Sequence, residues 1–384
     1  MNNFIFQTVG SLIQEPGVTS RLGEIAAGIG MSRVLLVSDP GIAEIGLLER
    51  AETGLSSGGL KVSIFSEVLP DPPVDNIMAA LEQARDFGAD GVVGFGGGSS
   101  MDVAKLVAFL SHSSQALSDI YGVGLARGKR LPLILVTTTA GTGSEVTPIA
   151  IVTTGESEKK GVVAQQLLPD VALLDAELTT GLPPRITAMT GVDAMVHAIE
   201  AYTSRVKKNP ISDTLARQGL KLLFENIHVV MENGNDLEAR SQMLLGALFA
   251  GQAFANAPVS AVHALAYPIG GHYHVPHGLS NSLILPHVMR FNLPVAGKEY
   301  AELGRDLFDD LGSANDLAAG AKLISALEQL IVDVKLETRL SEVGIEKQAL
   351  PQLAESAMLQ TRLLVNNPRE VNYEDALQIY RDAW

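Results

Sequence analysis

Short apolar runs alternate with helical patterns in the first half of the chain. The runs are rich in β-branched residues, which is typical of strands, and they cover residues 33–38, 61–65, 91–95 and 131–136. Between some of them, apolar positions recur every three or four residues over 74–87 and 100–110, which predicts helices. This alternation is typical of a parallel sheet with helices packed on it. We therefore expect an α/β domain built from repeated strand, loop and helix.

The pattern changes at residues 178–184, where Leu-Thr-Thr-Gly-Leu is followed by two prolines. After this point the strand-like runs stop and long helical patterns continue to the C-terminus, with candidates over 185–204, 209–232 and 236–256. We place a domain boundary at the paired prolines. The sequence thus predicts an α/β domain over residues 1–183 and a helical domain over residues 184–384.

The composition narrows the range of partners. Only 18% of the residues are charged, and 28 Lys and Arg stand against 43 Asp and Glu, which gives a net charge of −15. An acidic protein has no general attraction for phosphate backbones or anionic lipid, so we expect a small-molecule partner and neither nucleic acid nor membrane. The chain has no cysteine, which excludes disulfides, a thiolate nucleophile and cysteine-bound metal. The N-terminus lacks the pattern of a secretory signal, so we expect a cytoplasmic protein.

One long segment, residues 241–289, contains no Asp, Glu, Lys or Arg. It includes Gln252, Asn256, Pro258, Pro268 and five of the eight histidines, which a membrane span of about 20 apolar residues would not tolerate. We interpret it as a deeply buried segment of a globular domain, so its histidines need another explanation.

A glycine-rich loop over residues 94–100, Gly-Phe-Gly-Gly-Gly-Ser-Ser, follows a predicted strand and precedes a predicted helix. Bare backbone at a helix N-terminus lets N–H groups approach an anion, so the loop suits a phosphate, although a tight turn without a ligand has the same residues. The dinucleotide fingerprint G-x-G-x-x-G is not satisfied, because its third glycine falls on Ser99. We therefore expect phosphate binding outside an ordinary dinucleotide module.

Two more strand ends carry groups that suit a nucleotide. Asp39 ends the first strand and is a candidate ligand for a ribose 2′-hydroxyl, which would favour NAD over NADP; the alternative is a cap of the following turn. Residues 137–145 combine consecutive threonines with glycines and offer hydroxyls and amides to ribose, diphosphate or a nicotinamide amide. The alternative there is an ordinary strand end. Lys159 and Lys160 are candidates for further hydrogen bonds, although paired lysines are also common on solvated surfaces.

The histidine-rich part of the chain points to a metal. Asp193 and His197 are four residues apart, which places a carboxylate and an imidazole on one face of a helix, although a helical Asp–His hydrogen bond has the same spacing. His263 and His277 supply two more nitrogens from the uncharged segment. One carboxylate and three neutral imidazoles suit a divalent ion such as Fe²⁺ or Zn²⁺. A closed structural metal site is the alternative to a catalytic one.

Four segments, taken together and in order, resemble the iron-containing (group III) alcohol dehydrogenase family over nearly the whole chain; they are residues 94–102, 138–147, 190–202, and 263–268 with 276–278. The resemblance implies the dehydroquinate synthase-like architecture of that family. Its α/β N-terminal domain, with a parallel, Rossmann-like sheet, binds the dinucleotide, and its all-α C-terminal domain binds the metal. It also implies a cleft between the two domains and a homodimer.

The resemblance also assigns residues to roles. The family's metal ligands correspond to Asp193, His197, His263 and His277. Its NAD contacts correspond to Asp39, Gly96, Gly97, Gly98, Ser99, Thr138, Thr139, Lys159 and Leu178. The implied activity is an NAD(H)-linked alcohol dehydrogenase or aldehyde reductase, with hydride transfer between a small alcohol and the nicotinamide while the metal polarises the oxygen.

The chain departs from the family at one position. The family commonly has a histidine four residues after the third ligand, near the nicotinamide, where this chain has Tyr267. Tyr267, His272 and His274 are the candidates for proton transfer, and a purely pocket-shaping Tyr267 is the alternative. Ile149 and Phe254 are candidates for an apolar substrate pocket suited to small aliphatic alcohols.

Other activities share this architecture. They are a hydroxyacid–oxoacid transhydrogenase, a maleylacetate reductase, a lyase resembling dehydroquinate synthase, and an NAD-binding protein without catalysis. Net formation of NADH with simple alcohols separates the dehydrogenase from the lyase, and metal analysis separates an enzyme from a protein with a vestigial site.

Overall fold

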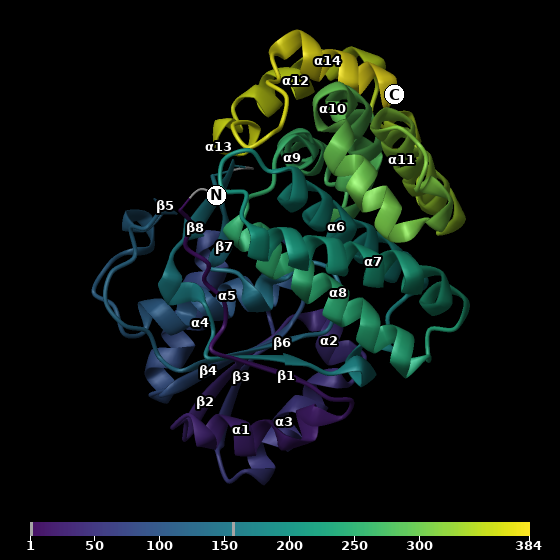
Figure 1. The fold of residues 1–384 in the computed structure, drawn as a ribbon. Helices are drawn as coiled ribbons and strands as arrows, with labels where there is room; N and C mark the ends of the chain where they lie inside the picture. Colours follow the sequence, from purple (N-terminus) through teal and green to yellow (C-terminus); the bar gives the residue numbers. More distant parts are fainter. Residues whose placement is uncertain (1–2, 156–157) are drawn as a thin grey trace. The chain divides into compact units, whose positions relative to one another are not determined.

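The computed structural model describes residues 3–155 and 158–384 (Figure 1). Contacts within the chain divide it into two compact units. One is Gln7–Gly181, and the other is Leu182–Trp384 with the described residues of Met1–Phe6. The chain thus passes between units at 181–182, beside the paired prolines, and the division into domains 1–183 and 184–384 stays a prediction.

The first unit contains a six-stranded sheet in which every neighbouring pair is parallel, in the order β1-β9-β6-β4-β2-β3. Its strands are β1 (Ser11–Gln14), β2 (Arg33–Val37), β3 (Lys61–Phe65), β4 (Gly91–Gly96), β6 (Leu133–Thr137) and β9 (Val171–Leu174). The four strands predicted over 33–38, 61–65, 91–95 and 131–136 are confirmed, and so is the parallel α/β class.

The helices of this unit are α1 (Leu22–Gly28), α2 (Pro40–Glu44), α3 (Leu47–Ser57), α4 (Val74–Phe87) and α5 (Gly98–Leu110). The helix predicted over 74–87 is confirmed at both ends, whereas the helix predicted over 100–110 begins two residues earlier, inside the glycine loop. Gly98 therefore begins the first turn of α5, and Gly97 is its N-cap. This places bare backbone N–H groups directly at the helix N-terminus.

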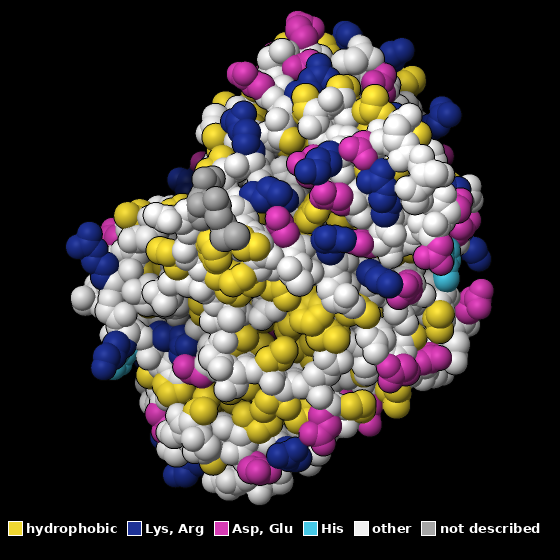
Figure 2. Space-filling view, viewed as in Figure 1, with side chains coloured by type: hydrophobic (Ala, Val, Ile, Leu, Met, Phe, Trp, Pro, Cys, Tyr) yellow, Lys and Arg dark blue, Asp and Glu magenta, His cyan; other side chains and the backbone are white. Residues whose placement is uncertain are grey.

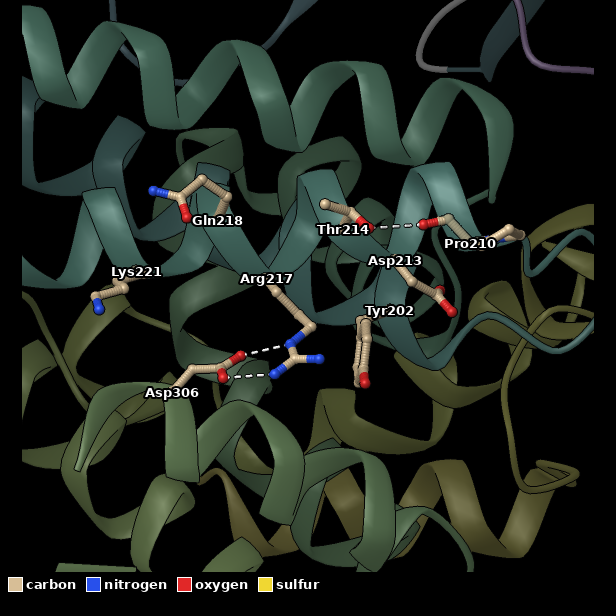
Figure 3. A pocket seen from close by; sticks show the side chains of 8 residues that line it. All are labelled: Tyr202, Pro210, Asp213, Thr214, Arg217, Gln218, Lys221 and Asp306. Carbon is tan, nitrogen blue, oxygen red and sulfur yellow. Dashed lines mark hydrogen bonds and ion pairs between the residues drawn. The ribbon is translucent and has the colours of Figure 1, made fainter. Parts of the chain in front are cut away.

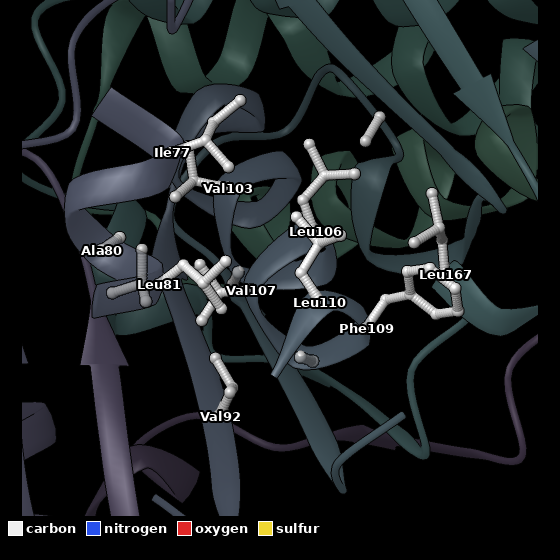
Figure 4. Packing of buried hydrophobic residues seen from close by; sticks show 14 of the residues in the cluster. Ile77, Ala80, Leu81, Val92, Val103, Leu106, Val107, Phe109, Leu110 and Leu167 are labelled. Atoms are coloured by element: carbon white, nitrogen blue, oxygen red, sulfur yellow. The ribbon is translucent and has the colours of Figure 1, made fainter. Parts of the chain in front are cut away.

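Alternate residues of the buried strands enter two hydrophobic cores, one on each face of the sheet. Leu35 and Val37 of β2 belong to one core, which α4 and α5 cover with residues such as Leu106 (Figure 4). Val34 and Leu36 belong to the other core, which also contains residues of α1 and α3. Because both faces are covered, these strands are apolar throughout rather than alternating, as is usual in parallel sheets.

The strand order brings three loops together at one edge of the sheet. β2 lies between β3 and β4, and β4 lies between β2 and β6, so the chain reverses direction across the sheet at the β2–β4 pair. All three strands β2, β4 and β6 are parallel, so the loops after them leave from the same edge. In open α/β sheets, ligands bind at the carboxyl ends of the strands beside such a reversal.

A second, three-stranded sheet in the order β5-β8-β7 was not predicted. Its strands are β5 (Gly122–Val123), β7 (Ile149–Thr154) and β8 (Glu158–Val163), and β7 pairs with β8 in an antiparallel ladder. The strand β8 starts with charged residues and is largely half-buried, so it lacks the apolar run that identified the other strands. The edge strand β1 was missed for the same reason, because three of its four residues are exposed.

The second unit is helical, as expected for the C-terminal half. Its helices are α6 (Pro184–Thr203), α7 (Pro210–Glu232), α8 (Leu237–Asn256), α9 (Ala261–Tyr273), α10 (His277–Leu307), α11 (Asp316–Asp333), α12 (Leu350–Met358), α13 (Thr361–Leu364) and α14 (Tyr373–Asp382). α6 packs against α7, α8 and α10, and its residues from Gly191 to Thr203 are all buried. Any polar side chain on this stretch of α6 is therefore held inside the unit.

Within the described residues, no single helix is long and apolar enough to cross a membrane; α8 and α9 reach that length and composition only jointly, across a bend of 104°. Figure 2 shows basic side chains interspersed with acidic ones over the helices near the C-terminus, so this face of the unit carries mixed charge.

Candidate functional site

Four side chains of the helical unit meet at one point. Asp193, His197, His263 and His277 each offer one ligand atom, and these atoms all lie within 4.8 Å of one another. The first three residues are buried, whereas the side chain of His277 is 40% exposed. The four side chains could hold a metal ion, and the cluster is most exposed at His277.

Local sequence explains how the four side chains converge. Asp193 and His197 are stacked one turn apart on α6, as their spacing predicted. His263 lies in the first turn of α9, and His277 begins α10 after Pro276. The next residue, Gly278, lets α10 approach α6 closely, since a Cβ there would lie 2.4 Å from the carbonyl oxygen of Met189. The Pro-His-Gly sequence thus seats His277 against the helix that carries the first two ligands.

The electrostatics of the cluster suit a divalent cation. Burial lowers the pKa of His197 to about 4, so its imidazole is neutral at neutral pH. Burial raises the pKa of Asp193, but the three histidines and the amide of Asn281 outweigh this effect and keep it below its ordinary value. A carboxylate beside neutral imidazoles is the donor set that first-row divalent metals prefer.

One buried atom without a partner also fits a bound group at this point. The Nδ1 atom of His197 is buried and has no hydrogen-bond partner within the part of the chain that the structure describes. Buried polar atoms without a partner are rare and indicate a group that the protein binds. The residues present therefore fit a metal ion.

Two further polar side chains contact the candidate ligands. Asn281, on α10, donates from Nδ2 to Asp193 Oδ1 at 2.6 Å, and the same nitrogen lies 3.2 Å from the Nε2 atoms of both His263 and His277. Glu200, on α6, contacts the other nitrogen of His263, with 2.6 Å between Oε2 and Nδ1. Neither residue was assigned a role from the sequence. The signal for Glu200 was its position three residues after His197, on the same face of the helix.

Two aromatic rings border the cluster. Phe254 stacks on His197 with ring centroids 4.4 Å apart. This candidate pocket residue therefore also fixes the imidazole of His197. The ring centroid of Tyr267 is 6.4 Å from that of His263 and 5.8 Å from that of His277. The structure therefore brings Tyr267 to the metal site.

The other two candidates for proton transfer have different surroundings. His272 is exposed, and its Nε2 lies 3.1 Å from the hydroxyl of Ser356. His274 ends α9 in the left-handed conformation with φ 54°. A non-glycine residue rarely adopts this conformation, and here it terminates the helix and turns the chain toward His277.

The loops after β2 and β4 of the first unit contact each other. Asp39 caps α2, with Oδ1 accepting from the backbone N–H of Ile42 at 3.1 Å, and its Oδ2 accepts from the hydroxyl of Ser100 at 2.9 Å. The cap that the sequence left as an alternative is thus present. Each oxygen of Asp39 still has a free lone pair for a ribose hydroxyl.

The glycine loop leaves room for a ligand at the N-terminus of α5. Gly96 has φ 147°, and a Cβ there would lie 2.8 Å from the Ser100 hydroxyl and 3.0 Å from Asp39 Oδ2. Gly97 is the N-cap, and a Cβ on it would meet nothing within 4 Å. Gly98 faces Thr142, and Ser99 is half-buried in the same turn. Open space at a helix N-terminus fits a phosphate group.

The remaining predicted NAD contacts have different surroundings in the structure. The hydroxyl oxygens of Thr138 and Thr139 are buried and, among the described residues, have no hydrogen-bond partner, which fits a polar ligand at this loop. Lys159, on β8, pairs with Asp71 at 2.6 Å, and Leu178 is buried in the core beside the sheet. The NAD-binding roles of these residues stay predictions.

The sequence did not reveal a buried charged network beneath the threonine loop. Lys105, on α5, is fully buried and donates to Ser144 Oγ at 2.6 Å and to the backbone oxygen of Ile149 at 2.7 Å. Asp102 accepts from Ser144 Oγ at 2.7 Å. Burial raises the pKa of the neighbouring Glu145 to about 7. A lysine three residues after Asp102, in a helix that is apolar from Val103 to Leu110 apart from Lys105, was the available signal. The network ties the threonine loop to α5.

A surface pocket of about 580 Å³ lies elsewhere in the helical unit, lined mainly by α7 (Figure 3). Arg217 forms two hydrogen bonds at 2.6 Å to Asp306 across it, and Asp213 at its rim pairs with Lys208 at 2.8 Å. Its main charges are satisfied by one another, and none of the four candidate ligands lines it. We therefore assign the functional site to the histidine cluster instead.

Comparison with known proteins agrees with this geometry. Residues 10–176 match the model of the iron-containing alcohol dehydrogenases, and residues 187–384 match the model of the C-terminal part of that family. A long-chain-alcohol dehydrogenase of Geobacillus thermodenitrificans is 38% identical over 93% of this chain and 90% of its own length. A sulfoacetaldehyde reductase of Bilophila wadsworthia is 35% identical over 98% of both chains.

A solved structure of a 1,3-propanediol oxidoreductase superimposes on the whole chain, with a TM-score of 0.96, 33% identity and 100% of both chains covered. The predicted fold class, including the dehydroquinate synthase-like architecture of the family, is thereby confirmed. Because the two family models together match most of the chain, and full-length relatives exceed 30% identity, the protein belongs to the iron-containing alcohol dehydrogenase family.

Proposed function

We propose that this protein is a metal-dependent, NAD(H)-linked alcohol dehydrogenase that also works in reverse as an aldehyde reductase. The observation that carries the proposal is the meeting of Asp193, His197, His263 and His277, whose ligand atoms lie within 4.8 Å of one another. These are the positions at which the family has its metal ligands. The 1,3-propanediol oxidoreductase and the long-chain-alcohol dehydrogenase that resemble the chain support the same reaction class.

The metal that we propose is Fe²⁺, with Zn²⁺ as the alternative, because both accept one carboxylate and three imidazoles. When bound, such an ion supplies Lewis-acid polarisation of an alcohol or aldehyde oxygen. The chain's part is to hold neutral imidazoles and an ionised carboxylate in place, and the low pKa values of His197 and Asp193 support this. The uncharged segment 241–289 carries two of the proposed ligands, and many of its apolar side chains are buried, which limits the access of water from around His263.

The cofactor that we propose is NAD, bound at the carboxyl ends of β2, β4 and β6. The diphosphate is expected at the open N-terminus of α5, beside Gly97, where a Cβ would meet nothing within 4 Å. Asp39 would accept from a ribose hydroxyl and repel a 2′-phosphate, so NAD is preferred over NADP. The unpartnered hydroxyls of Thr138 and Thr139 would bind the remaining polar groups.

Among the candidates for proton transfer, we propose Tyr267. Its ring centroid is 5.8 Å from that of His277, on the accessible side of the cluster, whereas His272 is hydrogen-bonded to Ser356 and His274 ends α9. A phenol hydroxyl can donate a proton to a product oxygen and accept one from an alcohol. Phe254 and Ile149 remain the proposed apolar lining of the substrate site.

The proposed setting is a cytoplasmic homodimer that acts on a small alcohol or aldehyde, without a nucleic-acid or membrane partner. The acidic composition, with a net charge of −15, supports the absence of such partners.

The test is a screen of alcohols of increasing chain length with protein purified without oxygen and loaded with Fe²⁺ or Zn²⁺. Absorbance at about 340 nm measures the formation of the reduced nicotinamide, with NAD and NADP compared. We expect turnover with the loaded enzyme and NAD, and loss of turnover after chelation. Metal-loaded protein that oxidises no alcohol and reduces no aldehyde would contradict the proposal.

A further inference from the structure

We propose that Glu200 is a positioning residue of the metal site, which fixes the imidazole of His263 so that its Nε2 lone pair faces the other ligands. The inference rests on the proposed metal, and it concerns a residue outside the four ligands. Glu200 follows Asp193 and His197 on the same face of α6, at a spacing of four and then three residues.

The first step is the hydrogen bond to the ring. Oε2 of Glu200 lies 2.6 Å from Nδ1 of His263, and both side chains are buried. An ionised carboxylate only accepts hydrogen bonds, so Nδ1 must carry the hydrogen. The lone pair of the neutral imidazole is then on Nε2, the other nitrogen. A metal ligand needs that lone pair.

An independent contact assigns the same tautomer. The amide nitrogen of Asn281 lies 3.2 Å from Nε2 of His263, and it also donates to Asp193 Oδ1 at 2.6 Å. An amide nitrogen has only hydrogens to offer, and after the one given to Asp193 the second is shared between Nε2 of His263 and Nε2 of His277. A proton on Nε2 of His263 would oppose this N–H, so the contact agrees with the tautomer set by Glu200. The contact with Glu200 and the contact with Asn281 lie on opposite sides of the ring and agree.

The second oxygen of Glu200 fixes the backbone that carries the ring. Oε1 accepts from the backbone N–H of Val262 at 2.7 Å and from the hydroxyl of Ser260 at 2.8 Å. The first turn of a helix leaves N–H groups without intrahelical partners, and Ser260, the N-cap of α9, makes no side-chain cap bond. Glu200 supplies that cap from a neighbouring helix. The Glu200 carboxylate therefore caps the start of α9 and also fixes the rotation of the His263 ring.

Substitutions at Glu200 separate the two roles. Glu200→Gln keeps the size of the side chain and one accepting oxygen for the α9 cap, but it places an N–H donor or a rotated amide against Nδ1. Glu200→Asp keeps the charge and withdraws the carboxylate from the ring. Ser260→Ala weakens the start of α9 and leaves the bond between Glu200 and His263 in place.

The experiment is a competition between the full-length protein and a chromophoric chelator for Zn²⁺, which gives the dissociation constant without any assay of turnover. We expect Glu200→Gln to bind Zn²⁺ about 10- to 100-fold more weakly than the unmodified protein, as is usual when the partner of a metal-ligating histidine is removed. Glu200→Asp should weaken binding in the same direction. Ser260→Ala should lower the unfolding temperature of the metal-free protein and change the dissociation constant less than Glu200→Gln does.

A matched control is Asp236→Asn, an acid-to-amide change at the N-cap of α8, where Asp236 accepts from Ala239 at 2.9 Å. It should leave the Zn²⁺ affinity unchanged. NAD affinity should be unchanged in every variant, and far-ultraviolet circular dichroism reports whether each is folded. If Glu200→Gln does not fold, Glu200→Asp carries the test.

If the folded Glu200 variants bind Zn²⁺ as tightly as the unmodified protein does, the inference is overturned and the proposed function stays intact. Equal weakening by Ser260→Ala and Glu200→Gln would also overturn it, because the effect would then come from the start of α9 alone. Absence of Zn²⁺ and Fe²⁺ binding by the unmodified protein would overturn this inference and the proposed function together.

Discussion

The two candidate binding regions are made from different chemistry. The metal site of the helical unit consists of four side chains, three of them buried, on α6, α9 and α10. The proposed NAD site of the α/β unit consists largely of backbone, with Gly96, Gly97 and Gly98 at the start of α5. Binding at a site made of side chains depends on particular ligand atoms. Binding at a site made of backbone depends on the open space that the glycines leave. Substitutions that remove atoms should therefore damage the first, and substitutions that add atoms should damage the second.

The largest expected effect is at the metal ligands. His263→Ala or His277→Ala should lower turnover by about 10³-fold or more, because several kcal/mol of transition-state stabilisation depend on the metal. The NAD dissociation constant, measured by fluorescence titration, should stay within about twofold, since the ligands and the glycine loop belong to different compact units. A collapse of NAD affinity in either variant would break the comparison between the two regions.

The second effect is on stability and concerns Glu145 of the α/β unit. Burial raises its pKa from the ordinary 4.5 to about 7, so the folded protein keeps a proton that the unfolded chain releases. This contribution to stability is fully present below pH 4.5 and is lost as the pH rises through about 7. Glu145→Gln should match the unmodified protein near pH 4.5 and be more stable at pH 8, by on the order of 3 kcal/mol. Thermal unfolding at both pH values measures this, and equal pH profiles would contradict it.

The third effect tests the space in the glycine loop. Gly96→Ala adds a Cβ within 3.0 Å of Asp39 Oδ2 and closer still to the Ser100 hydroxyl, at a φ of 147° that favours glycine. We expect NAD to bind about 10-fold more weakly, or worse, because the loop must shift. Zn²⁺ affinity should not change. Gly59→Ala, which has φ 78° and no atom within 4 Å of the added Cβ, is a matched control for backbone strain.

A smaller effect is expected at Asp39. Asp39→Asn keeps the oxygen that caps α2 and removes the charge, so discrimination against the 2′-phosphate of NADP should fall by about 10-fold. The ratio of kcat/KM for NAD and NADP measures the change. An unaltered ratio would show that Asp39 acts only as the cap of α2.

The smallest effect is expected in the substrate pocket. Phe254→Ala and Ile149→Asn should each shift the preferred alcohol chain length and change kcat/KM by a few-fold, since apolar pocket side chains discriminate between alcohols by the methylenes that they contact. Phe254 also stacks on His197 at 4.4 Å, so its variant should bind Zn²⁺ somewhat more weakly, whereas the Ile149 variant should not. Chain-length profiles identical to that of the unmodified protein would remove both residues from the pocket.

The sequence indicated the cluster of four side chains well because its signals are local. Asp193 and His197 lie one turn apart on one helix, and the other two ligands are histidines in a segment that has no other charge. Their convergence within 4.8 Å was an expectation that only the fold could test. The strands β2, β3, β4 and β6 were equally visible, because buried parallel strands are continuous apolar runs.

The features that the sequence did not reveal depend on distant partners. Lys105 is stabilised by Ser144 and by the carbonyl of Ile149, which lie about 40 residues away along the chain. Glu200 meets His263 across two helices. The strand β8 has no continuous apolar run. A single position in a sequence does not show which partner a buried charge or a half-exposed strand will find.

The ligand positions also have a consequence for folding. Asp193 and His277 bracket most of α6 together with all of α7, α8 and α9, so an ion that joins them closes a loop of roughly 80 residues. An ion that binds the folded cluster and leaves the unfolded chain would stabilise the fold by RT ln(1 + [ion]/Kd), which is about 4 kcal/mol at about 1,000 times Kd. The ion thus acts as a reversible cross-link between the first and fifth helices of the unit. Depletion of iron or zinc would then lower the free energy of unfolding at the same time as it removes turnover.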